Sequence, residues 1–378
     1  MKIINLAQSL AIDSQLRLPG SAGRILKNIR DIEKIAPMFR DVGLVKPVPK
    51  LSIVDMNLAG ISTRSCVTKA LGGFIYVSAA VRIDLLIEQN KLSSGATDSI
   101  SELDDIDFEA QAKRLELIQI RQTYSLLEKI FNSAHSYNLI LIDTPFFLAR
   151  DMAPLDRHKK HKQEYEKTKK VIESFWDRFR QSIFPWNPNG PVVASILAER
   201  FSAIVSIAKQ DLRTAEGRSQ ILENDGFDAL MIKQLDEIEE QLIGIGDLRF
   251  INGILGNFTR TIAFRSHQSE NRIEPVKEVQ QGLIGFHFRS SRQGQIKFVQ
   301  LVGDEPAWTS ESLDIVASRL MALDMQNKGK AMPLPQLLGY QQLNILPQFA
   351  EFYRKGLHNA VKQNEVESGW LESLEGEE

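Results

Sequence analysis

Two aspartates follow strongly apolar segments of this chain. Asp55 ends the segment LSIVD, and Asp143 ends the segment LILID. A short, continuous apolar run that is bounded by polar or turn residues predicts a strand buried on both faces. If the two strands deliver their carboxylates to one edge of a sheet, the side chains can share a divalent cation, because hard cations prefer oxygen ligands. The alternative is that each aspartate starts a turn or caps a helix, which are common roles of this residue type.

Glu116 and Glu128 are acidic residues of the predicted helix at 108–134, and helix geometry gives their heights relative to Asp143. A strand of ~5–6 residues climbs about 17–20 Å, and a helix that rises ~1.5 Å per residue matches this height roughly 11–13 residues before its end. That height corresponds to residues 121–124, which are Arg, Gln, Thr and Tyr. On this estimate Glu116 lies roughly 8 Å above the height of Asp143, and Glu128 lies roughly 6–9 Å below it, measured along the helix axis. A shift of the helix boundary by several residues would bring Glu116 to the site.

The pattern of elements predicts the fold class. We expect strands at 51–55 and from 74, with a polar turn between them, and a polar, acidic segment at 91–107 that leads into the helix at 108–134. Further predictions are a helix over 1–45, a basic helix from 157, a strand at 191–197, helices after 201, a hairpin at 282–303 and helices at 310–325 and 346–363. This order predicts an α/β fold, a mixed sheet with helices on its faces.

Composition narrows the classes of function. Of the 378 residues 43% are hydrophobic and 25% are charged, as in ordinary globular proteins. The formal net charge of −2 means that contact with nucleic acid would need local basic surface. One cysteine, Cys66, excludes an internal disulfide and a multi-cysteine zinc site. The N-terminal residues lack a signal-peptide pattern, and no apolar run approaches the ~20 residues of a membrane span. We expect a soluble, cytoplasmic protein.

Five segments resemble, in order, the motifs of one enzyme family. They are SIVDMN (52–57), GGFIYVSAAV (72–81), LILIDTPFF (139–147), GNFTRTIAF (256–264) and AMPLPQLLGYQQLNI (331–345). Together they resemble the NurA family of DNA-end-processing nucleases, which have a ribonuclease-H-like core. The resemblance is spread over most of residues 50–346.

The resemblance implies a specific organisation and activity. The expected fold is a ribonuclease-H-like mixed sheet flanked by helices, with helical insertions and a late β-hairpin. The expected domains are an N-terminal helical segment (1–48), the NurA-like domain (49–346) with a basic helical insertion at about 155–185, and a C-terminal helix with an acidic tail (347–378). Family members are manganese-dependent DNA nucleases that form dimers and work with a HerA-type hexameric ATPase in DNA repair and end resection. Magnesium is the alternative metal.

Site residues are also implied by the resemblance. Asp55 and Asp143 match the family's metal-binding aspartates, and Glu116 is the candidate for the third ligand. Tyr340 falls at the site by register from Pro335. The residues expected to contact DNA are Lys159, Lys160 and Lys162 of the basic helix, together with Arg260.

The chain departs from the family pattern at these positions. Both aspartate motifs lack their glycine and serine, and read Asp-Met-Asn and Asp-Thr-Pro. Tyr340 replaces the histidine of the closing motif, and a tyrosine cannot act as a neutral imidazole ligand or carry a proton near neutral pH. The second hypothesis is therefore a catalytically weakened or inactive NurA-like protein that is a structural partner of a HerA-like ATPase. A third is an unrelated α/β binding protein. His158 and His161 are expected on a solvated basic face rather than at a metal.

Overall fold

The computed structural model describes residues 6–41, 43–49, 55–89, 91–133, 135–197, 245–265, 283–291, 294–303, 308–325 and 332–363. Its helices are α1 (Leu6–Asp41), α2 (Gln111–Phe131), α3 (Lys159–Phe179), α8 (Asp247–Ile254), α10 (Ser310–Met325), α11 (Leu334–Leu343) and α12 (Leu346–Lys362). Its strands are β1 (Val45–Pro47), β2 (Met56–Ala70), β3 (Gly73–Glu88), β4 (Lys91–Ile106), β5 (Leu139–Ile142), β6 (Val192–Leu197), β7 (Thr259–Thr261), β8 (Phe264–Arg265), β9 (Ile284–Arg289) and β10 (Lys297–Leu301). The helices expected after 201 and the acidic tail lie outside the described residues.

One ten-stranded sheet organises the described chain. Its order is β1-β7-β9-β10-β6-β5-β2-β3-β4, and β8 pairs with β9. The strands β2, β3 and β4 form an antiparallel meander, whereas β5 runs parallel to β2 and β6 runs parallel to β5. A three-stranded meander, a helix and then two strands parallel to the first are the ribonuclease-H-like arrangement. The predicted fold class, a mixed sheet flanked by helices, is confirmed.

The meander corrects two expectations from the sequence. The segment expected to be a turn after Asp55 is β2, which begins at Met56, so Asp55 directly precedes a strand. Apart from Asp55, the strand expected at 51–55 lies outside the described residues. The polar segment 91–107 contains the whole of β4. Among the described strands, β4 pairs with β3 alone and lies at the edge of the sheet. Polar and charged residues are typical of an exposed edge, because they oppose pairing with other chains, and such a strand lacks the apolar pattern of a buried one.

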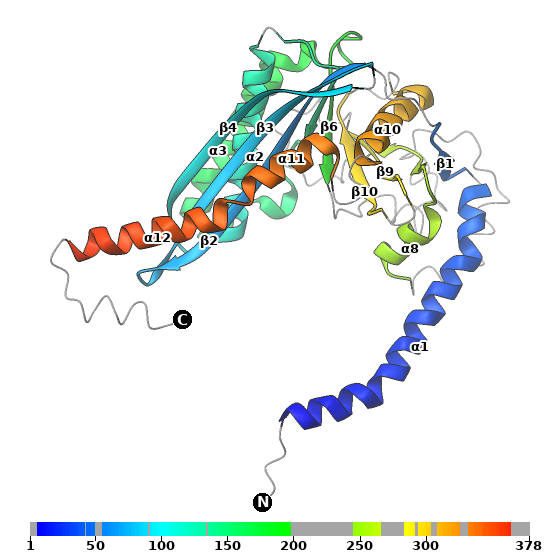
Figure 1. Cartoon of the computed structure of the whole chain (residues 1–378), viewed down its shortest axis with the longest axis horizontal. Helices are drawn as coiled ribbons and strands as arrows, with labels where there is room; N and C mark the ends of the chain where they lie inside the picture. The colour runs from blue at the N-terminus through cyan, green and yellow to red at the C-terminus, as the bar shows by residue number, and fades with distance from the viewer. Residues whose placement is uncertain are drawn as a thin grey trace, which may run out of the picture.

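Helices cover both faces of the sheet (Figure 1). Alternate residues of the central strands face opposite sides. Leu58 and Leu141 lie in one apolar core with side chains of α10, α11 and α12. Ala59 and Ile140 lie in another core with side chains of α2 and α3. Any side chain at the end of β2 or β5 is therefore placed on the α2 face or the α11 face by its position in the strand.

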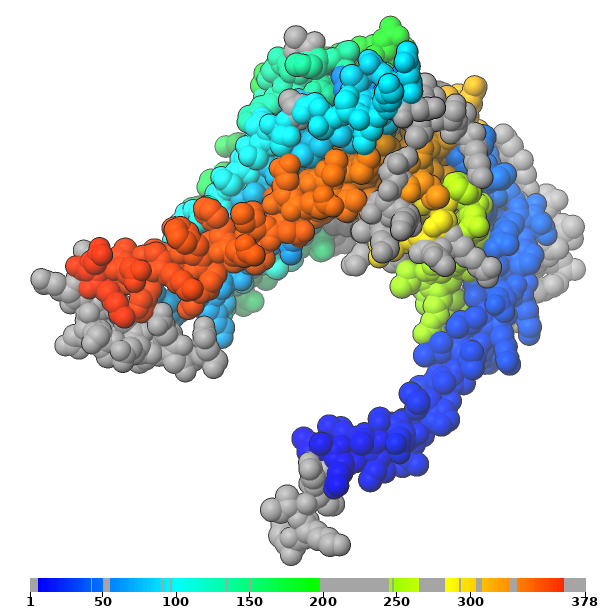
Figure 2. All heavy atoms as spheres, viewed as in Figure 1, coloured from blue at the N-terminus to red at the C-terminus, as the bar shows by residue number. Residues whose placement is uncertain are grey.

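The helix α1 belongs to a third core. Its C-terminal half packs against α8 through Ile32, Ala36 and Phe39, and the rings of Phe39 and Phe250 meet edge to face at 5.1 Å. The N-terminal half extends away from the rest of the molecule, with exposed side chains such as Leu10 and Leu16 (Figures 1 and 2). A search of the described helices finds none with the length and apolar character needed to span a bilayer.

Candidate functional site

Asp143 lies directly after β5 and beside β2. The two strands are parallel with Gly60 opposite Leu141, so the next residues of β2 reach Asp143. The amide nitrogen of Thr63 donates to Oδ2 of Asp143 at 2.7 Å, and the Thr63 hydroxyl donates to Oδ1 at 3.1 Å. The hydroxyl of Tyr340, from α11, donates to Oδ2 at 2.7 Å. Both carboxylate oxygens thus already accept hydrogen bonds from protein groups.

The helix α11 lies directly on β2 at this point. Ser62 is fully buried, and its hydroxyl donates to the carbonyl oxygen of Gln336 at 2.8 Å. A Cβ atom at Gly339 would be 2.8 Å from Oγ of Ser62, and a Cβ atom at Gly60 would be 2.7 Å from Cβ of Pro335. Two glycines therefore allow α11 and β2 to approach closely. Ser62 follows Leu58 and Gly60 on the α11 face, and α11 covers it.

A cavity of about 540 Å³ opens beside Asp143. Its polar lining residues are Thr63, Ser65, Glu116, Gln119, Asp143, Thr144 and Tyr340. Gln119 donates to the hydroxyl of Ser65 at 2.9 Å, which links α2 to β2. The structure thus brings Glu116, Asp143 and Tyr340 to one cavity. The sequence estimate placed Glu116 too high because it assumed that the helix and the strand end level, whereas residues 132–138 separate α2 from β5.

Asp55 is not at this cavity. It is exposed and lies just before β2, where its Oδ1 accepts a hydrogen bond from the amide of Gln89 at 2.7 Å. Thr63 lies eight residues further along the chain, which corresponds to about 26 Å of extended strand. The expectation that Asp55 and Asp143 reach the same edge of the sheet is therefore corrected. The reason is that the chain continues through Asp55 into a long strand instead of turning there.

The environment of Asp143 favours its protonated form. Burial raises the pKa of Asp143 to about 6, although the hydrogen bonds from Thr63 and Tyr340 favour the carboxylate. Burial, followed by the nearby charge of Asp143, also raises the pKa of Tyr340, so its hydroxyl stays protonated and acts as a donor. This pair can hold α11 against the end of β5, and of its two groups Asp143 titrates near neutral pH whereas the Tyr340 hydroxyl does not.

The described residues fit a two-metal centre poorly. No three histidine, cysteine, aspartate or glutamate side chains in the described ranges are close enough together to hold a metal ion. Glu116 and Asp143 are the carboxylates in the lining of the cavity. Hard divalent cations with a catalytic role need several oxygen ligands from the protein. This set of side chains therefore does not support a hydrolytic step through a metal at the cavity.

The residues expected to contact DNA differ in exposure. Lys159, Lys160 and Lys162 are exposed at the start of α3, and Lys160 forms an ion pair with Asp107 at 2.5 Å that raises the pKa of its ammonium group. Arg260 is fully buried on β7, where its Nε donates to Asp314 at 2.6 Å. A buried, paired guanidinium cannot reach a phosphate, so the DNA-contact prediction for Arg260 is wrong.

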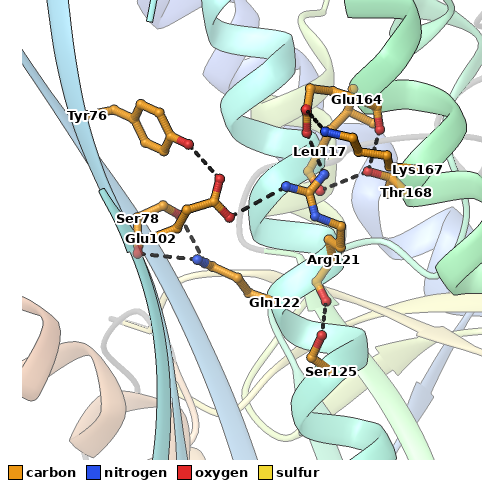
Figure 3. Close-up of polar contacts among 10 residues, drawn as sticks. All are labelled: Tyr76, Ser78, Glu102, Leu117, Arg121, Gln122, Ser125, Glu164, Lys167 and Thr168. Atoms are coloured by element: carbon orange, nitrogen blue, oxygen red, sulfur yellow. Dashed lines mark hydrogen bonds and ion pairs between the residues drawn. The ribbon is translucent and has the colours of Figure 1, made fainter. Parts of the chain in front are cut away.

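The inner side of α3 is tied to α2 and β4 by a charged network (Figure 3). Arg121 of α2 bonds Glu164 of α3 at 2.5 Å and lies 3.5 Å from Glu102 of β4. Burial opposes the ionisation of Glu164, but its ion pairs with Lys167 and Arg121 outweigh this effect and lower its pKa. His161, expected on a solvated face, is buried, and burial lowers its pKa. Lys159 and Lys162 are exposed and take no part in the contacts drawn in Figure 3.

Replacement of Asp143 by asparagine is expected to raise the melting temperature at pH 8. The asparagine side chain can accept the bonds of Thr63 and Tyr340 through its oxygen and donate to the Thr63 hydroxyl, without a buried charge. The pKa of Asp143 is about 6 when folded, against 3.8 as the usual value. The folded protein thus binds more protons between these values, and its stability falls as the pH rises through this window. The difference in melting temperature between the variant and the wild type should grow from pH 4 to pH 8. A constant difference would contradict it.

Sequence reasoning missed Ser62, Thr63 and Gly339. Gly72 has a positive φ of 75°, and with Leu71 it forms the two-residue turn between β2 and β3. That turn was visible in the sequence. If the strand before this turn is assumed to be as long as the strand after it, it includes Ser62 and Thr63. The contact of Gly339 with Ser62 depends on tertiary packing and had no local signal.

Comparison with solved structures finds proteins of similar fold. The NurA nuclease from Sulfolobus solfataricus matches with a TM-score of 0.55 and 12% sequence identity, over 97% of this chain and 99% of that chain. A NurA structure with manganese matches with a TM-score of 0.44 and 12% identity, over 91% of this chain and 98% of that one. No protein-family model matches the sequence, and a search of curated proteins finds no significant match. The expected likeness to NurA structures is confirmed at the level of the fold by the Sulfolobus structure.

Proposed function

We propose that this chain is a NurA-like protein of DNA end processing that acts as a structural partner of a HerA-type hexameric ATPase and does not itself hydrolyse DNA. The observation that carries the proposal is the state of Asp143. Three protein donors occupy its oxygens, and the neighbouring position of β2 on the same face is Ser62, beneath α11. A two-metal nuclease needs carboxylates from adjacent strands at this point. The similarity in fold to a NurA nuclease supports the architecture of the proposal.

Within this proposal the chain is a cytoplasmic homodimer that contacts DNA through exposed lysines of α3. Lys159 and Lys162 face solvent, and phosphate contacts need no particular base sequence. The role of such a subunit is to dock on the ATPase and to guide DNA. The chemistry would belong to another component of the assembly.

A metal-binding and cleavage experiment tests the proposal. We expect the wild type to show no cleavage of linear DNA with Mn²⁺ or Mg²⁺ above the level of the Asp143→Ala variant, and no thermal shift with either ion. A ligand that binds only the folded state stabilises it by about 2.7 kcal/mol at a hundredfold excess over its Kd, so binding would be visible. We also expect the chain to co-purify with a hexameric ATPase.

The exposed Asp55 provides a matched control. Asp55→Ala also removes one negative charge, but Asp55 is separated from Thr63 by about 26 Å of extended strand. This variant should behave as the wild type in both assays. DNA cleavage that Asp143→Ala abolishes and Asp55→Ala leaves intact would overturn the proposal.

A second candidate function is a manganese-dependent DNA nuclease, with magnesium as the alternative metal. The observation in its favour is that Glu116 and Asp143 line one open cavity. In that case Oδ1 of Asp143, which accepts one hydrogen bond, keeps a lone pair for the ion, whereas Oδ2 accepts two. Cleavage that depends on both Glu116 and Asp143 would select this candidate.

A further inference from the structure

A second cavity, of about 630 Å³, lies between α1 and α8. Three arginines line it, namely Arg40 from α1, Arg249 from α8 and Arg289 from the end of β9, together with the amides of Asn252 and Asn257. Glu33 is the single carboxylate among the lining residues that the structure describes. The formal charge of the lining is therefore positive. A concave site of this size is in the usual range for small ligands.

Backbone carbonyl groups hold two of these arginines in place. Nε of Arg40 donates to the carbonyl of Ile254 at 3.1 Å, and its Nη2 donates to the carbonyl of Gly253 at 3.2 Å. Nη1 of Arg289 donates to the carbonyls of Asn252 and Leu255 at 3.1 and 3.3 Å. Neutral acceptors orient a guanidinium without cancelling its charge.

Interaction with the C-terminus of α8 does not explain why all three arginines line the cavity. Cations near a helix C-terminus are favourable because that end carries roughly half a negative charge. Arg40 and Arg289 already bring two full charges to the last turn of this helix. Arg249 lies in the first turn of α8, is exposed, and is not needed there as a cap.

The scaffold beneath the cavity is rigid. A Cβ atom at Gly253 would lie 2.2 Å from Cγ1 of Ile32, so α1 and α8 are in very close contact. The edge-to-face rings of Phe39 and Phe250 join the same two helices. A guanidinium held on such a scaffold loses little freedom when it binds an anion.

We propose that the cavity between α1 and α8 binds a phosphate group through Arg40 and Arg249. Guanidinium groups match the oxygens of phosphate in pairs, and the asparagine amides can donate to further oxygens. The phosphate can belong to a small anion or to a nucleic-acid backbone that inserts one phosphate at the mouth. The site is separate from the Asp143 cavity, and the proposal does not depend on the proposed function.

The test is a binding titration of the full chain with two probes, pyrophosphate and a single-stranded DNA oligonucleotide, at low salt. Loss of one charge-assisted hydrogen bond to phosphate weakens binding by about ten- to a hundredfold. We expect such a loss in Arg249→Gln, which removes an exposed charge and should leave folding intact. Arg40→Lys, which keeps the charge but loses the planar fork, should show a smaller loss. Arg17→Gln, an exposed arginine of α1 outside the cavity, is the matched control.

The outcomes separate the sources of the phosphate. Pyrophosphate binding that Arg249→Gln weakens and Arg17→Gln does not would support the site with a small anion as ligand. DNA binding alone with the same response would support it with a nucleic-acid backbone as ligand. Absence of binding for both probes, or equal weakening by Arg249→Gln and Arg17→Gln, would overturn the proposal.

Discussion

Replacement of Lys297 by methionine is expected to lower the free energy of unfolding by about 3–5 kcal/mol. Lys297 of β10 is fully buried, and its Nζ lies 2.7 Å from Oδ1 of Asp324 of α10, which is equally buried. The hydroxyl of Ser290 bonds the other oxygen of Asp324. Burial lowers the pKa of Lys297, and the charge of Asp324 opposes this change. The substitution leaves the carboxylate of Asp324 buried without its cation. Urea denaturation measures the loss.

Two further variants show whether the lost partner is the cause. The double variant Lys297→Met/Asp324→Leu removes both charges and should recover most of the stability, because apolar replacement of a whole buried pair is often neutral. Lys129→Met breaks an ion pair with Asp98 at 2.9 Å, whose side chains are 49% and 35% exposed. This change should cost less than about 1 kcal/mol. Similar losses in Lys297→Met and Lys129→Met would refute this explanation.

Replacement of Gly60 by alanine should destabilise the protein by about 1–3 kcal/mol, as expected for overpacking of a tight interface. The added Cβ would lie 2.7 Å from Cβ of Pro335 and 3.0 Å from the backbone nitrogen of Gln336. Backbone atoms cannot rotate away as a flexible side chain can, so α11 must move off β2. That movement would pull Tyr340 from Asp143. Denaturation and the pH dependence of the melting temperature report the two effects.

Gly356→Ala is the matched control for this substitution. Gly356 lies in α12, and a Cβ atom there would meet no atom within 4 Å. Alanine is the better helix former, so this variant should be more stable than the wild type by up to about 1 kcal/mol. Equal effects of Gly60→Ala and Gly356→Ala would show that α11 does not lie tightly on β2.

The tight contact of α11 with β2 links the stability of the protein to its proposed role. Tyr340 closes the end of β5 through its bond to Asp143, and Ser62 is sealed below. A two-metal site would need more carboxylates at the cavity than Glu116 and Asp143. Tyr340 and Ser62 instead stabilise the packing of α11 on the sheet, which is consistent with the proposed role as a structural subunit.

The sequence alone determined elements with strong local patterns. The helical spacing of apolar residues predicted α2, and the short apolar runs before Asp143 and at 192–197 predicted β5 and β6. The late hairpin was predicted from two runs around a polar loop. These succeed because each pattern reflects which face of the element is buried, and that information is carried by neighbouring residues. The motif order also indicated the fold class.

Only the tertiary structure decided which side chains meet. β4 has an exposed edge and β2 is polar in its second half, so neither shows the apolar pattern from which strands are predicted. For this reason the sequence did not show that Asp55 directly precedes a long strand. The parallel register of β2 with β5 put Thr63 beside Asp143, and the packing of α11 brought Tyr340 to the same carboxylate. Contacts between residues so distant in the chain depend on register and on helix docking, which no local pattern encodes.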